Sequence, residues 1–116
     1  MIVGIHHFSL IASSLDSLVF YEKLGFREYK RVERKYDTVV LMNGHGIGLE
    51  VYIDPSHPAR SSPEPTGLRN LSLRVDKLED TIEELKVEAG PIMTDWTGVR
   101  FCFIADPDGL AVQLHE

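Results

Sequence analysis

Hydrophobic and polar residues alternate with a period of two along several short stretches of the chain, as between Phe8 and Ala12. Such alternation is typical of a β-strand that buries one face, because successive side chains point to opposite sides. Where Gly, Pro, Asn or Asp interrupts the pattern, a turn is expected. Strands are predicted at residues 2–12, 27–36, 38–42, 47–53, 69–75, 91–95, 99–105 and 110–115.

Two other stretches carry apolar residues at helical spacing. The first follows Ser13-x-x-Asp16, which has the spacing of a capping box, and is predicted to end at Gly25. The second follows Asp76-x-x-Glu79, whose side chains are predicted to cap the helix. The residues of this helix that are predicted to face inward are Leu78, Ile82 and Leu85.

The sequence contains an internal repeat, because Gly4 and Leu10 recur 63 positions later as Gly67 and Leu73. The turn Asn43-Gly-His-Gly46 recurs in the same way as Asp106-Pro-Asp-Gly109. Each copy reads as a strand, a helix and three strands. A copy of this length alone would be marginally stable, so the halves are expected to pack within the chain or between chains.

The repeat divides the chain into a first βαβββ module at residues 1–54 and a second at residues 69–116. Residues 55–68 between them hold four of the six prolines and are predicted to form a linker loop. The fold class that follows is α+β, with both modules forming a curved mixed sheet that carries its helices on the outer face.

Four polar residues occupy repeat-related positions on the polar sides of the predicted strands. His7 corresponds to Asn70, and Glu50 corresponds to Gln113. Each alternates with aliphatic neighbours that are expected to face the helices. A polar concave face is a poor core and a candidate ligand cavity.

These features resemble the vicinal oxygen chelate (VOC) superfamily, which includes glyoxalase I and the bleomycin-resistance proteins. The resemblance covers the whole chain. The segments that carry it are His6-His7, Phe20-Tyr21-Glu22-Lys23-Leu24-Gly25-Phe26, Leu49-Glu50-Val51, Gly67-Leu68-Arg69-Asn70-Leu71 and Asp106-Pro107-Asp108-Gly109-Leu110.

The resemblance implies a divalent metal ion, Zn²⁺, Ni²⁺ or Mn²⁺, held in a cup formed by the concave face. One His and one Glu from each module would bind it. The corresponding positions here are His7, Glu50, Asn70 and Gln113. The second pair departs from the family pattern, because Asn70 replaces a His and Gln113 replaces a Glu. Both changes weaken the expected metal site, since neutral amide oxygens are poorer ligands for these ions.

Two functions from different classes follow from the resemblance. The first is a glyoxalase I-like lyase or isomerase that acts on a small oxygenated substrate, with Glu50 as the remaining catalytic base. The second is a non-catalytic, bleomycin-resistance-like protein that binds a small molecule in a cup with a degenerate metal site. Substrate contacts are predicted for Tyr52, Arg74, Trp96 and Phe101, and the resemblance implies a homodimer.

Composition narrows the remaining possibilities. The net charge of −6 argues against nucleic-acid binding, which favours basic surfaces. No apolar run is long enough to span a bilayer, and no signal sequence opens the chain, so a cytoplasmic location is expected. Cys102 is the single cysteine and is interpreted as a packing residue.

Several charged or titratable residues can be explained by a structural role instead of a role in a functional site. His6 has the opposite strand parity to His7 and is expected to pack or face solvent. Basic residues between Arg27 and Lys35 suit either an exposed edge strand or an anion-binding rim. Glu50 is expected to bind a metal or to pair with Arg74 or Arg100.

Overall fold

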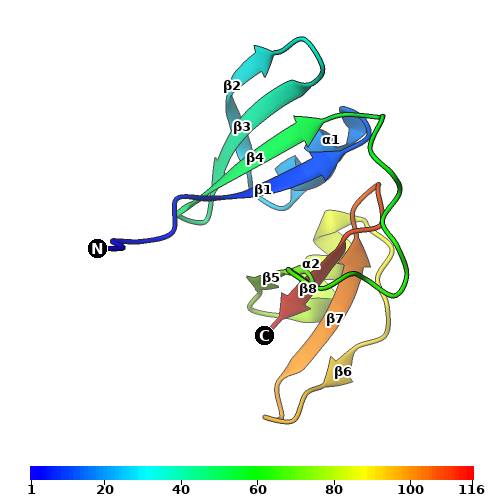
Figure 1. Ribbon diagram of the computed structural model, residues 1–116. Helices are drawn as coiled ribbons and strands as arrows, with labels where there is room; N and C mark the ends of the chain where they lie inside the picture. Colours follow the sequence, from blue (N-terminus) through cyan, green and yellow to red (C-terminus); the bar gives the residue numbers. More distant parts are fainter. The chain divides into compact units, whose positions relative to one another are not determined.

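The computed structural model describes all 116 residues of the chain. It divides into two compact units, Met1–Pro58 and Ala59–Glu116, and the division falls within the predicted linker. Each unit contains a four-stranded mixed sheet and one α-helix (Figure 1). The predicted α+β class with two βαβββ modules is therefore confirmed, and each module forms its own sheet.

The first unit follows the predicted order of elements. They are β1 (His7–Ala12), α1 (Asp16–Lys23), β2 (Arg27–Glu33), β3 (Thr38–Gly44) and β4 (Ile47–Ile53). The strand order is β1-β4-β3-β2, with β1 parallel to β4 and the other pairs antiparallel. Because β1 pairs with β4, the first and last strands of this module lie side by side.

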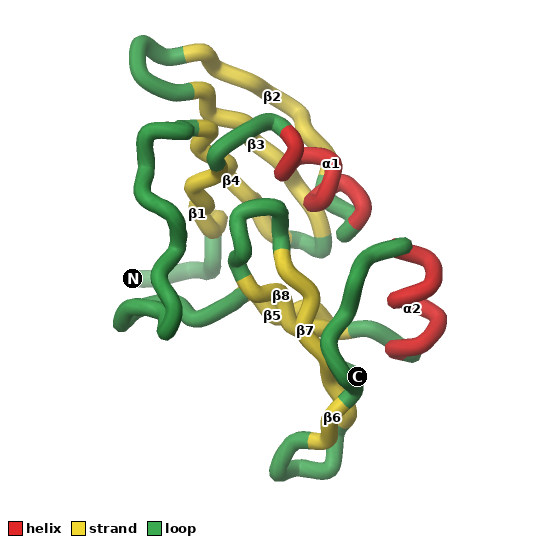
Figure 2. Tube along the Cα trace, turned by 90° about the vertical axis from the view of Figure 1, so that its right-hand side faces the viewer, coloured by secondary structure: helices red, strands yellow, loops and turns green.

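The core of the first unit lies between α1 and one face of its sheet, as the view in Figure 2 shows. On the sheet, Val40 pairs with Val51 and Met42 pairs with Leu49, and all four side chains are buried. On the helix, Tyr21 is fully buried. Burial of these aliphatic and aromatic surfaces is the main favourable term for a module of this size.

The turn between β3 and β4 falls where the sequence predicts a turn. His45 and Gly46 both have positive φ, 54° and 77°, as a two-residue type I′ hairpin requires. Gly46 adopts this conformation without a steric penalty, because it has no Cβ. The hairpin fixes the register of β4 and hence the face on which Glu50 lies.

The second unit repeats the same architecture with shorter strands. Its elements are β5 (Leu71–Arg74), α2 (Leu78–Leu85), β6 (Met93–Thr94), β7 (Arg100–Ala105) and β8 (Ala111–His115). The strand order is β5-β8-β7-β6, and β5 is parallel to β8. Its core contains the buried side chains of Leu78, Cys102, Ile104, Val112 and Leu114, so the packing role expected of Cys102 is confirmed.

The first strand is shorter than its pattern predicts, beginning at His7 instead of residue 2. Its only neighbour is β4, and the paired register begins with His7 opposite Gly48. Residues 2–6 therefore form no strand, because a hydrophobic pattern makes a strand only where a partner supplies hydrogen bonds.

The cap predicted for α2 is wrong in detail, whereas at α1 the hydroxyl of Ser14 accepts a hydrogen bond from the Asp16 amide at 3.2 Å. Asp76 accepts the Lys77 amide, one residue before α2 begins. The first amide of α2, that of Leu78, is instead capped by the carboxylate of Glu116.

Candidate functional site

Two polar side chains of the first unit meet on the exposed face of its sheet. His7 on β1 and Glu50 on β4 lie 3.2 Å apart between Nδ1 and Oε2, with side-chain exposures of 33% and 20%. Gly48 allows this approach, because a Cβ at that position would lie 3.0 Å from the Cβ of His7 and 2.9 Å from the carbonyl oxygen of His6. The sequence thus places a glycine where the two strands must come close.

Tyr52 continues the same polar row along β4. Its hydroxyl donates a hydrogen bond to Oε1 of Glu50 at 3.1 Å, and the guanidinium of Arg34 lies 5.3 Å from the centre of its ring. The hydrogen bond to the carboxylate, together with desolvation, raises the pKa of Tyr52 above its usual value. Both oxygens of Glu50 are therefore engaged, one by a histidine and one by a phenol.

Glu50 and the two arginines suggested as its partners belong to different units. Arg100 donates to the carboxylates of Glu79 and Glu116 within its own unit, at 2.6 and 2.8 Å. Arg74 is exposed on β5 and makes no ion pair within its unit. Glu50 instead pairs with His7, which comes from the same module and from a neighbouring strand.

His6 joins this group, contrary to the expectation from strand parity. Its Nδ1 lies 2.7 Å from Nδ1 of His7, and the two rings meet edge to face. Since β1 begins only at His7, alternation does not govern the direction of the His6 side chain. The adjacent histidines in the sequence were the available signal, and the strand boundary was the missing information.

The donor atoms of His6, His7 and Glu50 lie within 4.8 Å of one another. Imidazole and carboxylate suit Zn²⁺, Ni²⁺ and Mn²⁺, so the residue types fit a divalent ion. The separation of His7 and Glu50 fits two ligands of one ion, since nitrogens about 2.0–2.1 Å from tetrahedral Zn²⁺ are roughly 3.3 Å apart. The two histidine nitrogens, at hydrogen-bonding distance, would have to separate slightly to bind together.

The corresponding residues of the second unit form a neutral hydrogen-bonded chain. The Asn70 amide donates to the Ser72 hydroxyl at 3.0 Å, and this hydroxyl donates to Oε1 of Gln113 at 2.7 Å. Ser72 and Gln113 are register partners on β5 and β8. Ser72 was not among the predicted site residues, although its match to Ser9 in the repeat and its shared strand parity with Asn70 were available signals.

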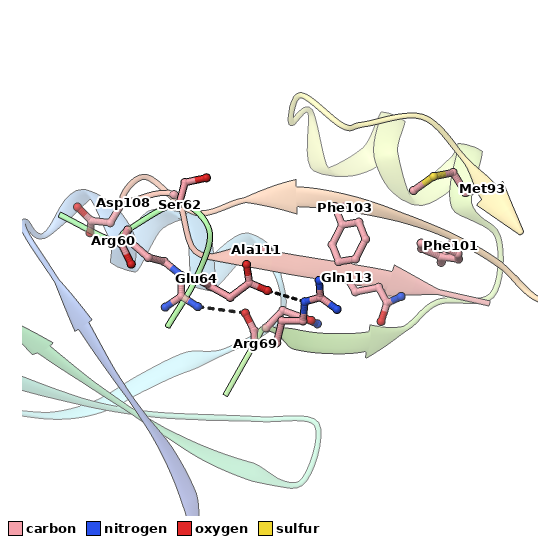
Figure 3. Close-up of a pocket in the computed structure, with 13 residues that line it drawn as sticks. Arg60, Ser62, Glu64, Arg69, Met93, Phe101, Phe103, Asp108, Ala111 and Gln113 are labelled. Carbon is pink, nitrogen blue, oxygen red and sulfur yellow. Dashed lines mark hydrogen bonds and ion pairs between the residues drawn. The ribbon is translucent and has the colours of Figure 1, made fainter. Parts of the chain in front are cut away.

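A cavity of about 630 Å³ opens beside this chain in the second unit. Its apolar wall includes Met93, Phe101 and Phe103, and the two phenylalanine rings meet edge to face with centres 5.8 Å apart. Asn70 and Gln113 also line it. Figure 3 shows that Arg60, Ser62 and Asp108 lie toward one end of the cavity, whereas Phe101 and Met93 lie toward the other.

The predicted substrate-binding residues have different surroundings. Phe101 lines the cavity, and Tyr52 contacts Glu50 in the first unit. Trp96 is 95% exposed in the turn between β6 and β7, and neither it nor the exposed Arg74 lines the cavity.

The basic residues of β2 fit the edge-strand interpretation. β2 is an edge strand of its sheet. Ion pairs neutralise one arginine within β2 and one just after it. Arg31 pairs with Glu28 at 2.7 Å and Arg34 pairs with Asp37 at 2.6 Å. Charge at an exposed edge discourages pairing with another chain.

Residues 4–114 match the family model of the Glyoxalase/Bleomycin resistance protein/Dioxygenase superfamily, and the chain belongs to this family. It is 36% identical over 127 residues to the uncharacterized protein YwkD of Bacillus subtilis (strain 168), covering 100% of this chain and 98% of YwkD. The resemblance expected from the sequence motifs is thereby confirmed.

Solved structures share the fold. A glyoxalase family protein from Enterococcus faecalis has a TM-score of 0.89 and 35% identity, with 97% of each chain covered. The fosfomycin resistance protein FosX from Listeria monocytogenes, in complex with Mn(II) and sulfate ion, has a TM-score of 0.76 and 18% identity over 99% of this chain and 93% of FosX. At that identity the likeness to FosX shows the fold alone.

None of the helices has the length and apolar character needed to cross a membrane.

Proposed function

We propose that this protein is a divalent-metal-dependent VOC enzyme that performs lyase or isomerase chemistry on a small oxygenated molecule. The observation that carries the proposal is that donor atoms of His6, His7 and Glu50 lie within 4.8 Å of one another. Nδ1 of His7 lies 2.7 Å from Nδ1 of His6 and 3.2 Å from Oε2 of Glu50. A divalent ion bound beside these atoms would be held by groups that already lie close together.

In this proposal His7 and Glu50 are the strong ligands, and His6 is a third donor within reach. Asn70 and Gln113 are weaker oxygen ligands contributed by the second module. A bound divalent ion would supply Lewis acidity toward adjacent oxygens of the substrate. The structure of FosX with Mn(II) supports this role for the fold, since that protein shares the fold and is seen in complex with a divalent ion.

Glu50 is proposed to move the proton in such a reaction. It is the only carboxylate in the cluster, and Tyr52 donates a hydrogen bond to its Oε1 at 3.1 Å. That hydrogen bond orients the carboxylate, the group that would accept the proton. The proposal also includes a homodimer, and a cytoplasmic location in which the buried thiol of Cys102 stays reduced.

One observation favours a second candidate, a non-catalytic protein that sequesters a small molecule. The oxygen of Gln113 that would bind a metal already accepts a 2.7 Å hydrogen bond from Ser72. A metal would have to displace this bond to gain a neutral ligand, which weakens the second half of the site. Under this alternative, the cavity of the second unit binds its ligand without a metal.

Calorimetric titration of the metal-free protein with Ni²⁺, Zn²⁺ and Mn²⁺ separates these functions. We expect at least one ion to bind at a single site, and His7→Ala to weaken it by more than about tenfold, because a primary ligand is lost. His57→Ala is the matched control, since His57 is exposed and pairs with Asp54 in a loop.

Equal affinities in the wild type and in His7→Ala would contradict the site. Absence of binding for all three ions would contradict the metalloenzyme and leave the sequestering protein as the supported function.

A further inference from the structure

The cavity of the second unit is amphipathic. Its apolar part is formed by Met93, Phe101 and Phe103, whose side chains come from β6 and β7. These side chains are partly exposed, with Met93 at 42% and Phe103 at 36%. Partly exposed aromatic rings beside a cavity offer a surface for the apolar body of a ligand.

The opposite part of the cavity is charged and is covered by the loop before β5. Arg60, Glu64 and Arg69 all line the cavity from this loop (Figure 3). Nε of Arg69 donates to Oε1 of Glu64 at 2.6 Å. The charge of Arg69 is therefore already balanced by a carboxylate within the loop.

Arg60 differs from Arg69 in its partner. Its Nη2 donates only to a backbone carbonyl, that of Arg69, at 3.1 Å, and it makes no ion pair within its unit. A guanidinium has five N–H donors, so most of the donors of Arg60 remain available to a ligand. Asp108 also lines the charged part, so the whole region is not strongly positive and selectivity must come from direct contact with Arg60.

We propose that this cavity selects small molecules with an apolar or aromatic body and one anionic oxygen group, a carboxylate or a phosphate, which Arg60 binds. This inference rests on the proposed function, because it assumes that the protein binds a small molecule at this cavity. A planar guanidinium matches the two oxygens of such a group in a bidentate arrangement. The phenylalanine rings would contact the apolar body at the other part of the cavity.

NMR-monitored titrations at constant, low ionic strength and in excess EDTA test the selectivity without any metal. The probes are phenylacetate, phenyl phosphate, the neutral isostere phenylacetamide and inorganic phosphate. We expect at least one aromatic anion to bind about tenfold more tightly than phenylacetamide, as a charge-assisted contact predicts. We also expect inorganic phosphate to bind more weakly than phenyl phosphate, because it lacks the apolar body.

In the variant Arg60→Gln, the aromatic anion and phenylacetamide should bind about equally well, since glutamine keeps a hydrogen-bond donor and lacks the charge. Arg60→Lys should restore part of the preference, which separates the effect of charge from a change in the loop. Arg31→Gln is the matched control, because it removes a paired arginine in the first unit. Its preference should equal that of the wild type.

Several results would overturn the proposal. These are equal binding of phenylacetamide and both aromatic anions, no binding of either aromatic anion, an unchanged preference in Arg60→Gln, or inorganic phosphate binding as tightly as phenyl phosphate. The metal titration is independent of this outcome. Anion selectivity without metal binding would support the proposed anion site and contradict the metalloenzyme. Metal binding without anion selectivity would support the metalloenzyme and contradict the proposed anion site.

Discussion

At the scale of single residues, the two copies of the repeat have different chemistry at matching positions. His7 and Glu50 form a polar pair that can carry charge, at 3.2 Å. Asn70 and Gln113 are neutral amides joined through the hydroxyl of Ser72. The first pair has the ligand types that transition metals prefer, and the second pair satisfies its own hydrogen bonds.

This difference predicts the result of restoring the family ligands. The double variant Asn70→His with Gln113→Glu should bind Ni²⁺ or Zn²⁺ at least about tenfold more tightly than the wild type, because imidazole and carboxylate replace amide oxygens. Calorimetric titration measures the change. Val19→His is the control, since it adds a histidine at an exposed position of α1, away from the polar face of the sheet.

An affinity that does not change in the double variant would mean that Asn70 and Gln113 are not part of the metal site. A gain of the same size in Val19→His would show that an added histidine binds metal without the proposed site.

Strand parity predicted the direction of some side chains and failed for others. Parity correctly placed Glu50 on the face opposite the buried Leu49 and Val51. The same rule failed for His6, because His6 precedes the first paired residue of β1. Periodicity predicts a side chain's direction only inside a regular element, and the sequence does not mark the boundary.

At the scale of elements, α2 depends on a residue far along the chain. The amide of Leu78, the first residue of the helix, donates to Oε2 of Glu116 at 2.9 Å. Arg100 donates to both oxygens of the same carboxylate, at 2.9 and 2.8 Å. These bonds to Arg100 and to the Leu78 amide lower the pKa of Glu116 from 4.5 to about 2.

The lowered pKa has a defined consequence for stability. A depressed folded-state pKa means that the charged form stabilises the fold at every pH above the unfolded-state value, and that this stabilisation is lost as pH falls from 4.5 toward about 2. Glu116→Gln should therefore lower the Tm by several degrees at pH 7. The Tm difference from the wild type should narrow across that acidic window.

Thermal unfolding of both proteins between neutral and acidic pH measures this prediction. Glu84→Gln is the control, because Glu84 is an exposed glutamate on the same helix and makes no ion pair within its unit. If Glu116→Gln and Glu84→Gln have the same Tm at pH 7, Glu116 does not stabilise α2.

At the scale of the whole molecule, each unit is small for an independent domain. A module of this length buries a modest fraction of its surface and has one helix on one face of its sheet. Large apolar side chains remain exposed in the single chain, including Ile11 at 54% and Trp96 at 95%. Association with a second copy is one way to remove such surface from water.

We therefore expect a homodimer. Sedimentation equilibrium should give twice the chain mass of 13.1 kDa at micromolar concentration. A mass of one chain at all concentrations tested would contradict the dimer and would require each chain to be stable alone.

The sequence by itself determined the repeated βαβββ order, the turn that includes Gly46 and the polar face that carries His7 and Glu50. These features follow from alternation and turn chemistry, which depend on residues close together in the chain. Only the tertiary structure decided which side chains are partners. Glu116 caps α2 from 38 positions away, and Ser72 reaches Gln113 across 41 positions. A carboxylate or hydroxyl has many candidate partners at such separations, and only the packed strands select one.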